Sequence, residues 1–327
     1  MTLPTRRHRS LNLTALGAGC AQLGNLSFAM SDDEAEQTVR AAWESGIRYF
    51  DTAPHYGLGL SERRLGRALS AYPRDEYVVS TKVGRLLEPN PVAGQSDLVN
   101  GFDVPADTQR VYDFSRDGVL RSIEESLDRL GLDRIDVVYL HDPDEHWEQA
   151  STTGAATLAQ LRDEGVIGGF GAGMNQTGML ADFIERADVD LLMCAGRLTL
   201  LEHASAERML EAATRHDVAI VAAAVYNSGL LSRESVPDDA TFDYAQAPAE
   251  LIARARVIEA VCRRHGVSLP AAALQFALRY PQVVSVVAGF RGAEQAAQTA
   301  ERMAAPIPDE FWAELEATSL ITPRRTA

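Results

Sequence analysis

The sequence predicts a single-domain α/β protein with a (β/α)8 barrel, the TIM-barrel fold. Eight short apolar runs alternate with amphipathic helical patterns along the 327 residues, and no Pro/Gly/Ser-rich linker divides them. The apolar runs are nearly continuous rather than alternating, which is typical of parallel strands covered on both faces. Eight strand-then-helix units in one chain favour one closed barrel over residues 1–327. A doubly wound open sheet is the alternative fold.

The eight expected strands are spaced so that a helix fits between neighbours. They lie at residues 14–16, 47–52, 77–83, 135–141, 166–171, 189–194, 219–225 and 283–288. The clearest helical patterns lie at residues 32–45, 116–130, 205–216 and 249–265. Ser31 and Ser115 precede two of these as expected N-caps, with an acidic residue close behind each. Gly46, Gly131 and Gly266 follow three of them, where a left-handed C-terminal cap favours glycine.

A long irregular stretch, residues 84–112, separates the third strand from its helix. Loops of this length in a compact domain are usually functional or mobile. On a barrel this one would lie over the C-terminal face, where active sites form. We therefore expect residues 84–112 to contribute to substrate specificity.

The composition indicates a globular protein that acts on a small-molecule substrate. Hydrophobic residues make up 46 % and charged residues 24 % of the chain, and the formal net charge is −15. Nucleic acid and anionic membranes need a basic face, so neither is an expected partner. The three cysteines fit neither a disulfide framework nor a zinc site. The basic first ten residues lack a following apolar segment, and no run of about 18 apolar residues occurs, so we expect a cytoplasmic protein. Its oligomeric state stays open.

A glycine-rich segment after the first strand superficially resembles a dinucleotide-binding fingerprint. Residues 16–24 read LGAGCAQLG, and the pattern G-x-G-x-x-G requires glycine where Gln22 stands. No second strand ending in an acidic residue follows at the usual distance. A tight turn at the strand end explains the glycines better.

Four polar side chains fall at the carboxyl ends of three consecutive strands, where side chains meet on a barrel. Asp51 and Tyr56 follow the second strand, Lys82 lies near the end of the third, and His141 ends the fourth. Lys82 is also the only lysine among 31 basic residues. A lysine ammonium is compact and can perturb the pKa of a neighbour, whereas a guanidinium is bulky and planar. These four side chains are the candidate catalytic quartet.

The quartet suits proton transfer at an oxygen while a hydride moves at the attached carbon. The pKa of a free phenol is about 10, and an ammonium at Lys82 would lower the pKa of Tyr56. Asp51 would hold that ammonium in place in a poorly hydrated pocket. A neutral His141 would hydrogen-bond the substrate oxygen and orient it against Tyr56.

A metal-dependent barrel hydrolase is an alternative in the same region. It would use His55, His141, Asp142 and a carboxylated Lys82, but the chain has no His-x-His pair after the first strand. The remaining histidines in helical stretches are expected at surface or capping positions, and they are His203, His216 and His265. We expect no metal at the site.

The segments that carry the quartet resemble the signature motifs of the aldo-keto reductase family. They are residues 46–57 (GIRYFDTAPHYG), 61–66 (SERRLG), 80–83 (STKV) and 122–131 (SIEESLDRLG), the last leading to residues 136–141 (DVVYLH). The similarity extends over nearly the whole chain. It implies a barrel oxidoreductase with NAD or NADP as the cofactor and Tyr56 as the acid/base. It also implies that the catalytic tetrad consists of Asp51, Tyr56, Lys82 and His141.

The resemblance further implies which residues hold the nicotinamide nucleotide. They are Asn175 after the fifth strand, Tyr226, Ser228, Gly229 and Leu230 after the seventh, and Gly289, Phe290, Arg291 and Gln295 after the eighth. Other positions depart from the family pattern, because Met174, Ala195 and Leu198 stand where serine, glutamine and tyrosine are usual. Arg291 could bind a 2′-phosphate or the pyrophosphate, so NAD and NADP remain alternatives.

Residues 112–118, 195–201 and 225–231 look similar to bacterial aldose 1-dehydrogenases, which act on sugars such as L-fucose and D-arabinose, and to a pyridoxal 4-dehydrogenase. This similarity implies oxidation of a cyclic hemiacetal to a lactone with Tyr56 as the base. The expected substrate contacts are His55, Arg85, Tyr112, Phe114 and Trp147. An NADPH-dependent reductase of small aldehydes or ketones is an alternative, and a cofactor-binding regulatory subunit without turnover is another.

Overall fold

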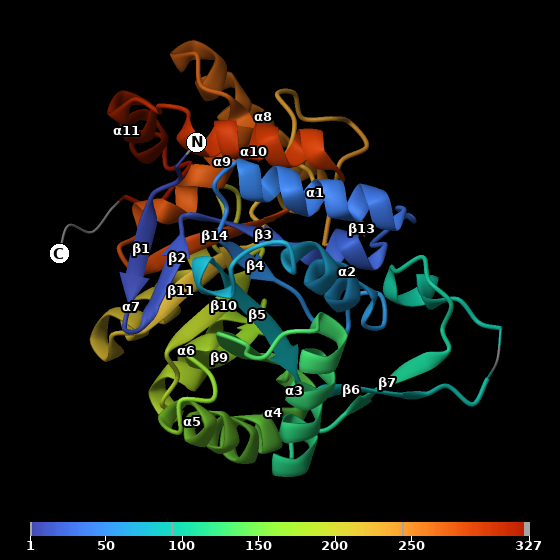
Figure 1. Cartoon of the computed structure of the whole chain (residues 1–327). Coiled ribbons are helices and arrows are strands. Elements are labelled where there is room, and N and C mark those ends of the chain that lie inside the picture. Colours follow the sequence, from blue (N-terminus) through green and yellow to red (C-terminus); the bar gives the residue numbers. More distant parts are fainter. Residues whose placement is uncertain (1, 93, 244, 324–327) are drawn as a thin grey trace.

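A computed structural model describes residues 2–92, 94–243 and 245–323 and shows a closed barrel of eight parallel strands (Figure 1). In order around the barrel, the strands are β3 (Leu16–Gly19), β4 (Tyr49–Asp51), β5 (Val78–Val83), β8 (Val137–His141), β9 (Gly169–Met174), β10 (Leu191–Ala195), β11 (Ala219–Ala223) and β14 (Val283–Gly289). Strand β14 pairs in parallel with β3, which closes the barrel. The prediction of a (β/α)8 barrel is confirmed, and the open-sheet alternative is wrong.

Helices surround the barrel (Figure 1). They are α1 (Asp32–Glu44), α2 (Leu60–Leu69), α3 (Arg116–Leu130), α4 (Trp147–Gln149), α5 (Ala155–Asp163), α6 (Thr177–Arg186), α7 (Glu207–His216), α8 (Ala249–His265), α9 (Leu269–Phe276), α10 (Ala293–Ala304) and α11 (Asp309–Ala317). The predicted caps of α1 and α3 are confirmed, since Ser31 forms a capping box and the Ser115 side chain accepts a backbone N–H. Gly131 and Gly266 are left-handed at the ends of α3 and α8, as expected. Among the described residues, no helix combines the length and the apolar character needed to cross a membrane.

Two expected strands are displaced along the sequence. The first barrel strand is β3 rather than residues 14–16, because residues 5–14 form an antiparallel hairpin of β1 (Thr5–His8) and β2 (Leu11–Thr14). The fifth is β9 rather than residues 166–171. Because β9 is rich in glycine, its sequence does not show the apolar run expected of a strand, yet the barrel requires these glycines. A Cβ at Gly171 would lie 1.6 Å from the carbonyl oxygen of Leu191.

Residues 84–112 are not the irregular loop that the sequence suggests. Strands β6 (Arg85–Pro89) and β7 (Thr108–Tyr112) pair antiparallel into a ribbon that projects from the barrel (Figure 1), with a short helical turn, Asp97–Asn100, between them. Residue 93 of this stretch lies outside the described residues. Glu88 on the ribbon pairs with Arg121 on α3, at 2.5 Å between Oε1 and Nη1. This ion pair ties the ribbon to α3. The ends of the ribbon that adjoin the barrel, Arg85 and Tyr112, lie beside the barrel mouth.

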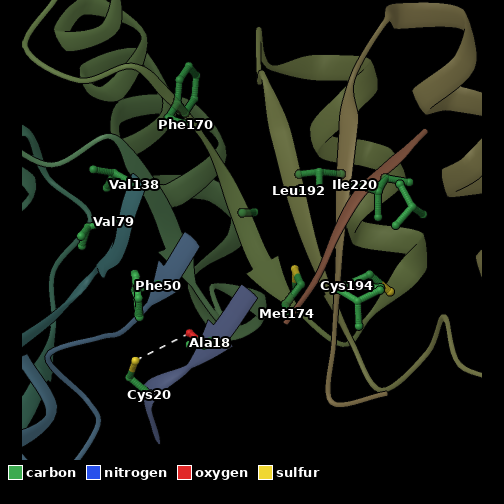
Figure 2. Packing of buried hydrophobic residues seen from close by; sticks show 14 of the residues in the cluster. Ala18, Cys20, Phe50, Val79, Val138, Phe170, Met174, Leu192, Cys194 and Ile220 are labelled. Atoms are coloured by element: carbon green, nitrogen blue, oxygen red, sulfur yellow. Dashed lines mark hydrogen bonds between the residues drawn. The ribbon is translucent and has the colours of Figure 1, made fainter. Parts of the chain in front are cut away.

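Alternation along the strands separates two layers of buried side chains. One layer packs between strands and helices, and its members include Phe50, Val138 and Leu192 (Figure 2). The other fills the barrel interior, and its members include Tyr49, Tyr139, Leu191 and the hairpin residues Leu11 and Leu13. Successive side chains of a strand point to opposite faces, so the residues two positions after Tyr49 and Tyr139 also point inwards. Those residues are Asp51 and His141, and the alternation therefore directs them into the carboxyl-end mouth of the barrel.

Candidate active site

The side chains of Asp51 and Lys82 form a buried ion pair at the carboxyl end of the barrel. Lys82 Nζ lies 2.7 Å from Asp51 Oδ2 and 3.0 Å from the carbonyl oxygen of Thr52. The other carboxylate oxygen, Oδ1, accepts a 2.7 Å hydrogen bond from Ser80 Oγ. Burial alone would lower the pKa of Lys82, but Asp51 and Tyr56 outweigh it and raise this pKa above its ordinary value. Lys82 is therefore an ammonium at neutral pH.

The turn after β4 places Tyr56 against this ion pair. Gly57 has φ +61°, and a Cβ there would lie 2.2 Å from the carbonyl oxygen of Gly24, so only glycine fits the turn. Lys82 Nζ lies 4.7 Å from the centre of the Tyr56 ring, and the His141 ring stands edge-on to it at 5.9 Å. The structure thus brings together the four side chains of the predicted quartet.

Burial dominates the pKa of the Tyr56 phenol. Burial raises this pKa, the Lys82 charge lowers it and Asp51 raises it, and the net result is a pKa of about 12. The effect of Lys82 has the direction that the sequence argument expected, but desolvation of the phenolate is larger. Tyr56 is therefore a protonated acid at neutral pH and a strong base once ionised.

His141 is a neutral imidazole. Burial lowers its pKa well below the ordinary value, and the cations Arg85 and Lys82 lower it further. Its Nε2 lies 3.7 Å from Asp142 Oδ2, whereas Nδ1 is sealed and has no hydrogen-bond partner within the described part of the chain. A proton on Nδ1 would be a buried donor without an acceptor, which is costly. The Nε2–H tautomer is therefore favoured, and it offers a donor on the side of Asp142.

A polar cleft of about 350 Å³ opens beside the quartet. Its lining residues come from the loops after β5, β8 and β9 and from the ribbon, and they are Arg85, Tyr112, Asp142, Asp144, Glu145, His146, Asn175 and Gln176. Arg85 Nη2 lies 2.5 Å from Asp142 Oδ2, so an ion pair forms the wall of the cleft nearest to His141. Tyr112 stacks on His146 with ring centres 4.4 Å apart.

The predicted substrate residues divide into two groups. Three lie at the cleft or beside the quartet, and these are His55, Arg85 and Tyr112. The other two, Phe114 and Trp147, are drawn into the layer between strands and helices. Phe114 is fully buried, and the Trp147 ring packs edge-on against Phe183 at 4.7 Å. Phe114 supports the cleft wall from behind, since its ring lies beside those of Tyr112 and His146. Trp147 packs against α6 instead.

A second pocket, of about 180 Å³, lies between the loop after β14 and the segment before α1. The Arg291 guanidinium lies 4.1 Å from the centre of the Phe28 ring at this pocket. Gln295 Oε1 accepts a 2.9 Å hydrogen bond from the Arg291 backbone N–H. The pocket adjoins the N-terminus of α10, and helix N-termini favour anions. A phosphate group fits this arrangement.

The remaining predicted cofactor residues occupy different environments. Asn175 lines the cleft, and Gly289 packs against the Gln22 side chain. Ser228 and Gly229 lie in a turn after β11 with φ of +57° and +93°, next to Tyr226. Leu230 and Phe290 are 1 % and 3 % exposed, so their side chains are buried rather than open to a cofactor.

Two polar residues that the sequence analysis did not assign to a site lie on either side of β14. Gln22 follows β3 and Asn227 follows β11, and β14 pairs with both strands. The side-chain oxygens of both are buried and have no hydrogen-bond partner among the residues that the structure describes. Unpaired buried amide oxygens are rare and require a reason, such as a bound ligand. The sequence signal that could have identified them is a side-chain amide in the segment that follows a barrel strand.

No group of three or more His, Cys, Asp or Glu side chains in the described residues has a metal-binding arrangement. The Lys82 ammonium is bound to Asp51 rather than placed as a bridge between His55 and His141.

Comparison with known proteins shows the family of the chain. The Aldo/keto reductase family model matches residues 15–319. The chain is 49 % identical to D-threo-aldose 1-dehydrogenase of a Pseudomonas species over 98 % of both chains. It is 40 % identical to pyridoxal 4-dehydrogenase of Microbacterium luteolum over 95 % of this chain and 96 % of that one.

Solved structures share the fold. A glycerol dehydrogenase from Gluconobacter oxydans matches with a TM-score of 0.78 over 99 % of both chains at 24 % identity. An aldo-keto reductase from Bacillus halodurans matches with a TM-score of 0.74 over 96 % of both chains at 23 % identity. The family match excludes the metal-dependent hydrolase alternative. The chain belongs to the aldo/keto reductase family and is an NAD(P)-dependent oxidoreductase.

Proposed function

We propose that the protein oxidises the hemiacetal carbon of a neutral aldose, of the L-fucose or D-arabinose type, to a lactone and passes the hydride to NAD or NADP. The observation that carries this proposal is the converged quartet in a chain 49 % identical to a D-threo-aldose 1-dehydrogenase. The cleft beside the quartet supports it, since its lining side chains are polar and suit a molecule with several hydroxyls.

The described residues fit a nicotinamide nucleotide. Arg291, at the N-terminus of α10, can hold a phosphate. The unpaired amide oxygens of Gln22 and Asn227 can accept hydrogen bonds from the nucleotide. When bound, the nicotinamide supplies the hydride acceptor. The turn at Ser228 and Gly229 offers backbone groups to the same molecule.

The quartet divides the proton chemistry among its members. The anomeric hydroxyl gives its proton to ionised Tyr56, the hydride leaves the same carbon, and the oxygen forms the carbonyl of the lactone. Lys82 stabilises the phenolate by charge, and Asp51 fixes the position of Lys82. The Nε2–H of His141 donates to the reacting oxygen and orients it. The same groups run the reverse reaction with Tyr56 as the acid.

The experiment is the formation of reduced nicotinamide by the purified protein with L-fucose, D-arabinose or pyridoxal, each with NAD and with NADP. The test variant is Tyr56→Phe, and the matched control is Tyr72→Phe, a partly exposed tyrosine stacked on Trp43. We expect turnover with an aldose, a loss of about 100-fold or more in Tyr56→Phe, and none in the control. Equal turnover by wild type and Tyr56→Phe would contradict the acid/base role. The preferred nucleotide follows from the ratio of kcat/KM values.

Oxidation of pyridoxal is the second candidate, because the chain is 40 % identical to a pyridoxal 4-dehydrogenase. The same assay separates the two, since kcat/KM is compared between an aldose and pyridoxal. A reductase of small aldehydes would instead consume reduced nicotinamide and leave all three oxidations slow. Cofactor binding without turnover in either direction would favour the regulatory subunit.

A further inference from the structure

His55 lies between the quartet and the β6–β7 ribbon, and two guanidinium groups face its Nδ1 atom. Arg110 Nε lies 2.5 Å and Arg85 Nη1 lies 3.3 Å from Nδ1. Arg110 Nη2 also donates a 2.7 Å hydrogen bond to the His55 carbonyl oxygen. Arg110 therefore binds both the backbone and the ring of the residue that precedes Tyr56.

Asp97 holds Arg110 in this position. Its carboxylate oxygens accept hydrogen bonds of 2.7 Å from Arg110 Nη1 and 2.6 Å from Nη2. The Asp97 side chain is 4 % exposed and that of Arg110 is 10 % exposed, so water competes little for this pair. Asn100 Nδ2 donates a further 2.7 Å bond to Asp97. A bidentate pair on the ribbon thus fixes the direction of the Arg110 Nε–H.

The geometry dictates the tautomer of His55. A guanidinium can only donate hydrogen bonds, so Nδ1 must accept and cannot carry a proton. A neutral ring then carries its proton on Nε2, the nitrogen on the other side of Cε1. No described residue accepts a hydrogen bond from this Nε2, and the atom is not sealed from solvent. The ring is edge-on to that of His141, with centres 5.4 Å apart.

Every charged group that faces His55 opposes its protonation or is already paired. Burial is the largest cause that lowers the pKa of His55, and together with the cations Arg110, Arg85 and Lys82 it brings this pKa to about 2. The carboxylates nearest these cations are Asp97, Asp142 and Asp51, and they pair with Arg110, Arg85 and Lys82 rather than with the imidazole. Tyr56 and His141 are its neutral neighbours.

We infer that Arg110 is a positioning residue that fixes His55 as its Nε2–H tautomer, so that His55 presents a second permanent hydrogen-bond donor, beside that of His141, to a neutral oxygen of the substrate. The substrate class is a molecule with an acceptor oxygen close to the reacting one, as in a polyol or cyclic sugar. That the acceptor is a sugar oxygen rests on the proposed function, whereas the tautomer does not.

Nitrogen-15 NMR of the labelled imidazoles tests the tautomer without any substrate, and His55→Gln assigns the His55 signals. We expect an unprotonated Nδ1, a protonated Nε2 and no titration of His55 between pH 8 and about 5. A proton on Nδ1, or titration near the ordinary histidine pKa of about 6.5, would overturn the inference.

Removing the hydrogen bond from Arg110 to His55 Nδ1 tests the role of Arg110. Arg110→Met alone would leave Asp97 as an unpaired buried carboxylate, so it is combined with Asp97→Asn. We expect the nitrogen-15 shifts of His55 at neutral pH to show a larger share of the Nδ1–H tautomer in this double variant, because the donor that keeps Nδ1 unprotonated is lost. Arg121→Met is the matched control, since it cuts a different ion pair of the ribbon, the one with Glu88. An equal change in Arg121→Met would show that ribbon movement is the cause, and the inference would fail.

Kinetics with the aldose test the donor itself. His55→Leu should raise KM about tenfold while kcat changes less, because a uniform binding contact is lost. His55→Gln keeps an N–H donor at a similar reach and should recover most of that loss. Equal impairment of both variants would contradict the donor role. If wild type oxidises no aldose, the proposed function fails, and the NMR result still decides the tautomer.

Discussion

Ser80 Oγ donates a 2.7 Å hydrogen bond to Asp51 Oδ1, on the carboxylate oxygen that Lys82 does not occupy. This bond is the last link of a hydroxyl chain inside the barrel, since Tyr49 Oη lies 3.0 Å from Ser80 Oγ and 3.2 Å from Tyr139 Oη. An ionised carboxylate can only accept, so each hydroxyl must donate towards Asp51. Aligned bonds of this kind strengthen one another in a low-dielectric interior.

Ser80→Ala should therefore lower kcat/KM for oxidation about tenfold. The carboxylate loses a charge-assisted hydrogen bond and binds the Lys82 ammonium more tightly, which weakens the support that Lys82 gives to the Tyr56 phenolate. Tyr139→Phe removes only the far end of the chain, and we expect a change of less than about threefold. Steady-state kinetics measures both, with circular dichroism as the check on folding. A larger effect of Tyr139→Phe than of Ser80→Ala would contradict the polarised chain.

The raised pKa of Tyr56 predicts different pH profiles for the two directions of the reaction. Oxidation needs the ionised phenol, whose fraction grows as the pH approaches a pKa of about 12. We expect kcat/KM for oxidation to rise by up to about tenfold per pH unit between about pH 7 and 10. Reduction needs the protonated phenol, so its kcat/KM should stay level in that window. An oxidation profile that is flat from pH 7 upwards would exclude Tyr56 as the titrating base.

The sequence predicted an element most accurately where a short sequence pattern is compatible with only one local structure. Residues 116–130 and 249–265 coincide with α3 and α8, because each ends at a left-handed glycine that no other residue replaces cheaply. The quartet could be predicted for a similar reason. A parallel barrel brings the carboxyl ends of its strands together at one face, so polar residues at the ends of buried strands meet there.

Features that depend on distant pairing could not be predicted in this way. The ribbon from Arg85 to Tyr112 looked irregular because its two short strands are separated by 18 residues and most of their side chains stay partly exposed. The contact of Arg110 with His55 spans 55 positions and depends on the ribbon. Strand β9 is rich in glycine and shows no strand pattern. Glycine is needed there because a side chain would overlap the backbone of Leu191.

The charge of the cleft predicts selection against phosphorylated substrates. Arg85 is neutralised by Asp142, while Asp144 and Glu145 form no ion pair within the described residues, so the cleft carries excess negative charge. We expect kcat/KM for a sugar phosphate to be about 100-fold below that of the free sugar. Asp144→Asn with Glu145→Gln should recover about tenfold of this loss and leave the free sugar within about twofold. Glu148→Gln, a nearby exposed residue outside the cleft, is the matched control. An unchanged ratio in the double variant would rule out charge as the cause.

His203 stands at the N-cap position of the helical turn Ala204–Ala206, one of the two positions expected for it, but its side chain is buried and does not cap the turn. The ring links the loop after β10 to the segment after α11. Its Nδ1 donates to the Thr199 carbonyl oxygen at 3.0 Å, and its Nε2 accepts the Thr322 N–H at 3.2 Å. The second bond requires a neutral ring. Burial accordingly lowers the pKa of His203 from its ordinary 6.5 to about 4.

This pKa predicts a loss of stability in mild acid. Between pH 6.5 and about 4 the unfolded chain binds a proton at His203 that the folded chain does not, so the free energy of unfolding falls as the pH falls through this window. The full difference corresponds to about 3 kcal/mol at most. His203→Gln can keep both hydrogen bonds but does not titrate. Urea unfolding at pH 7 and pH 4.5 should therefore show a smaller acid loss in His203→Gln than in wild type, by about 2 kcal/mol. Parallel losses in the two proteins would mean that His203 is not the acid-sensitive link, and that the carboxylate ion pairs alone govern the decline.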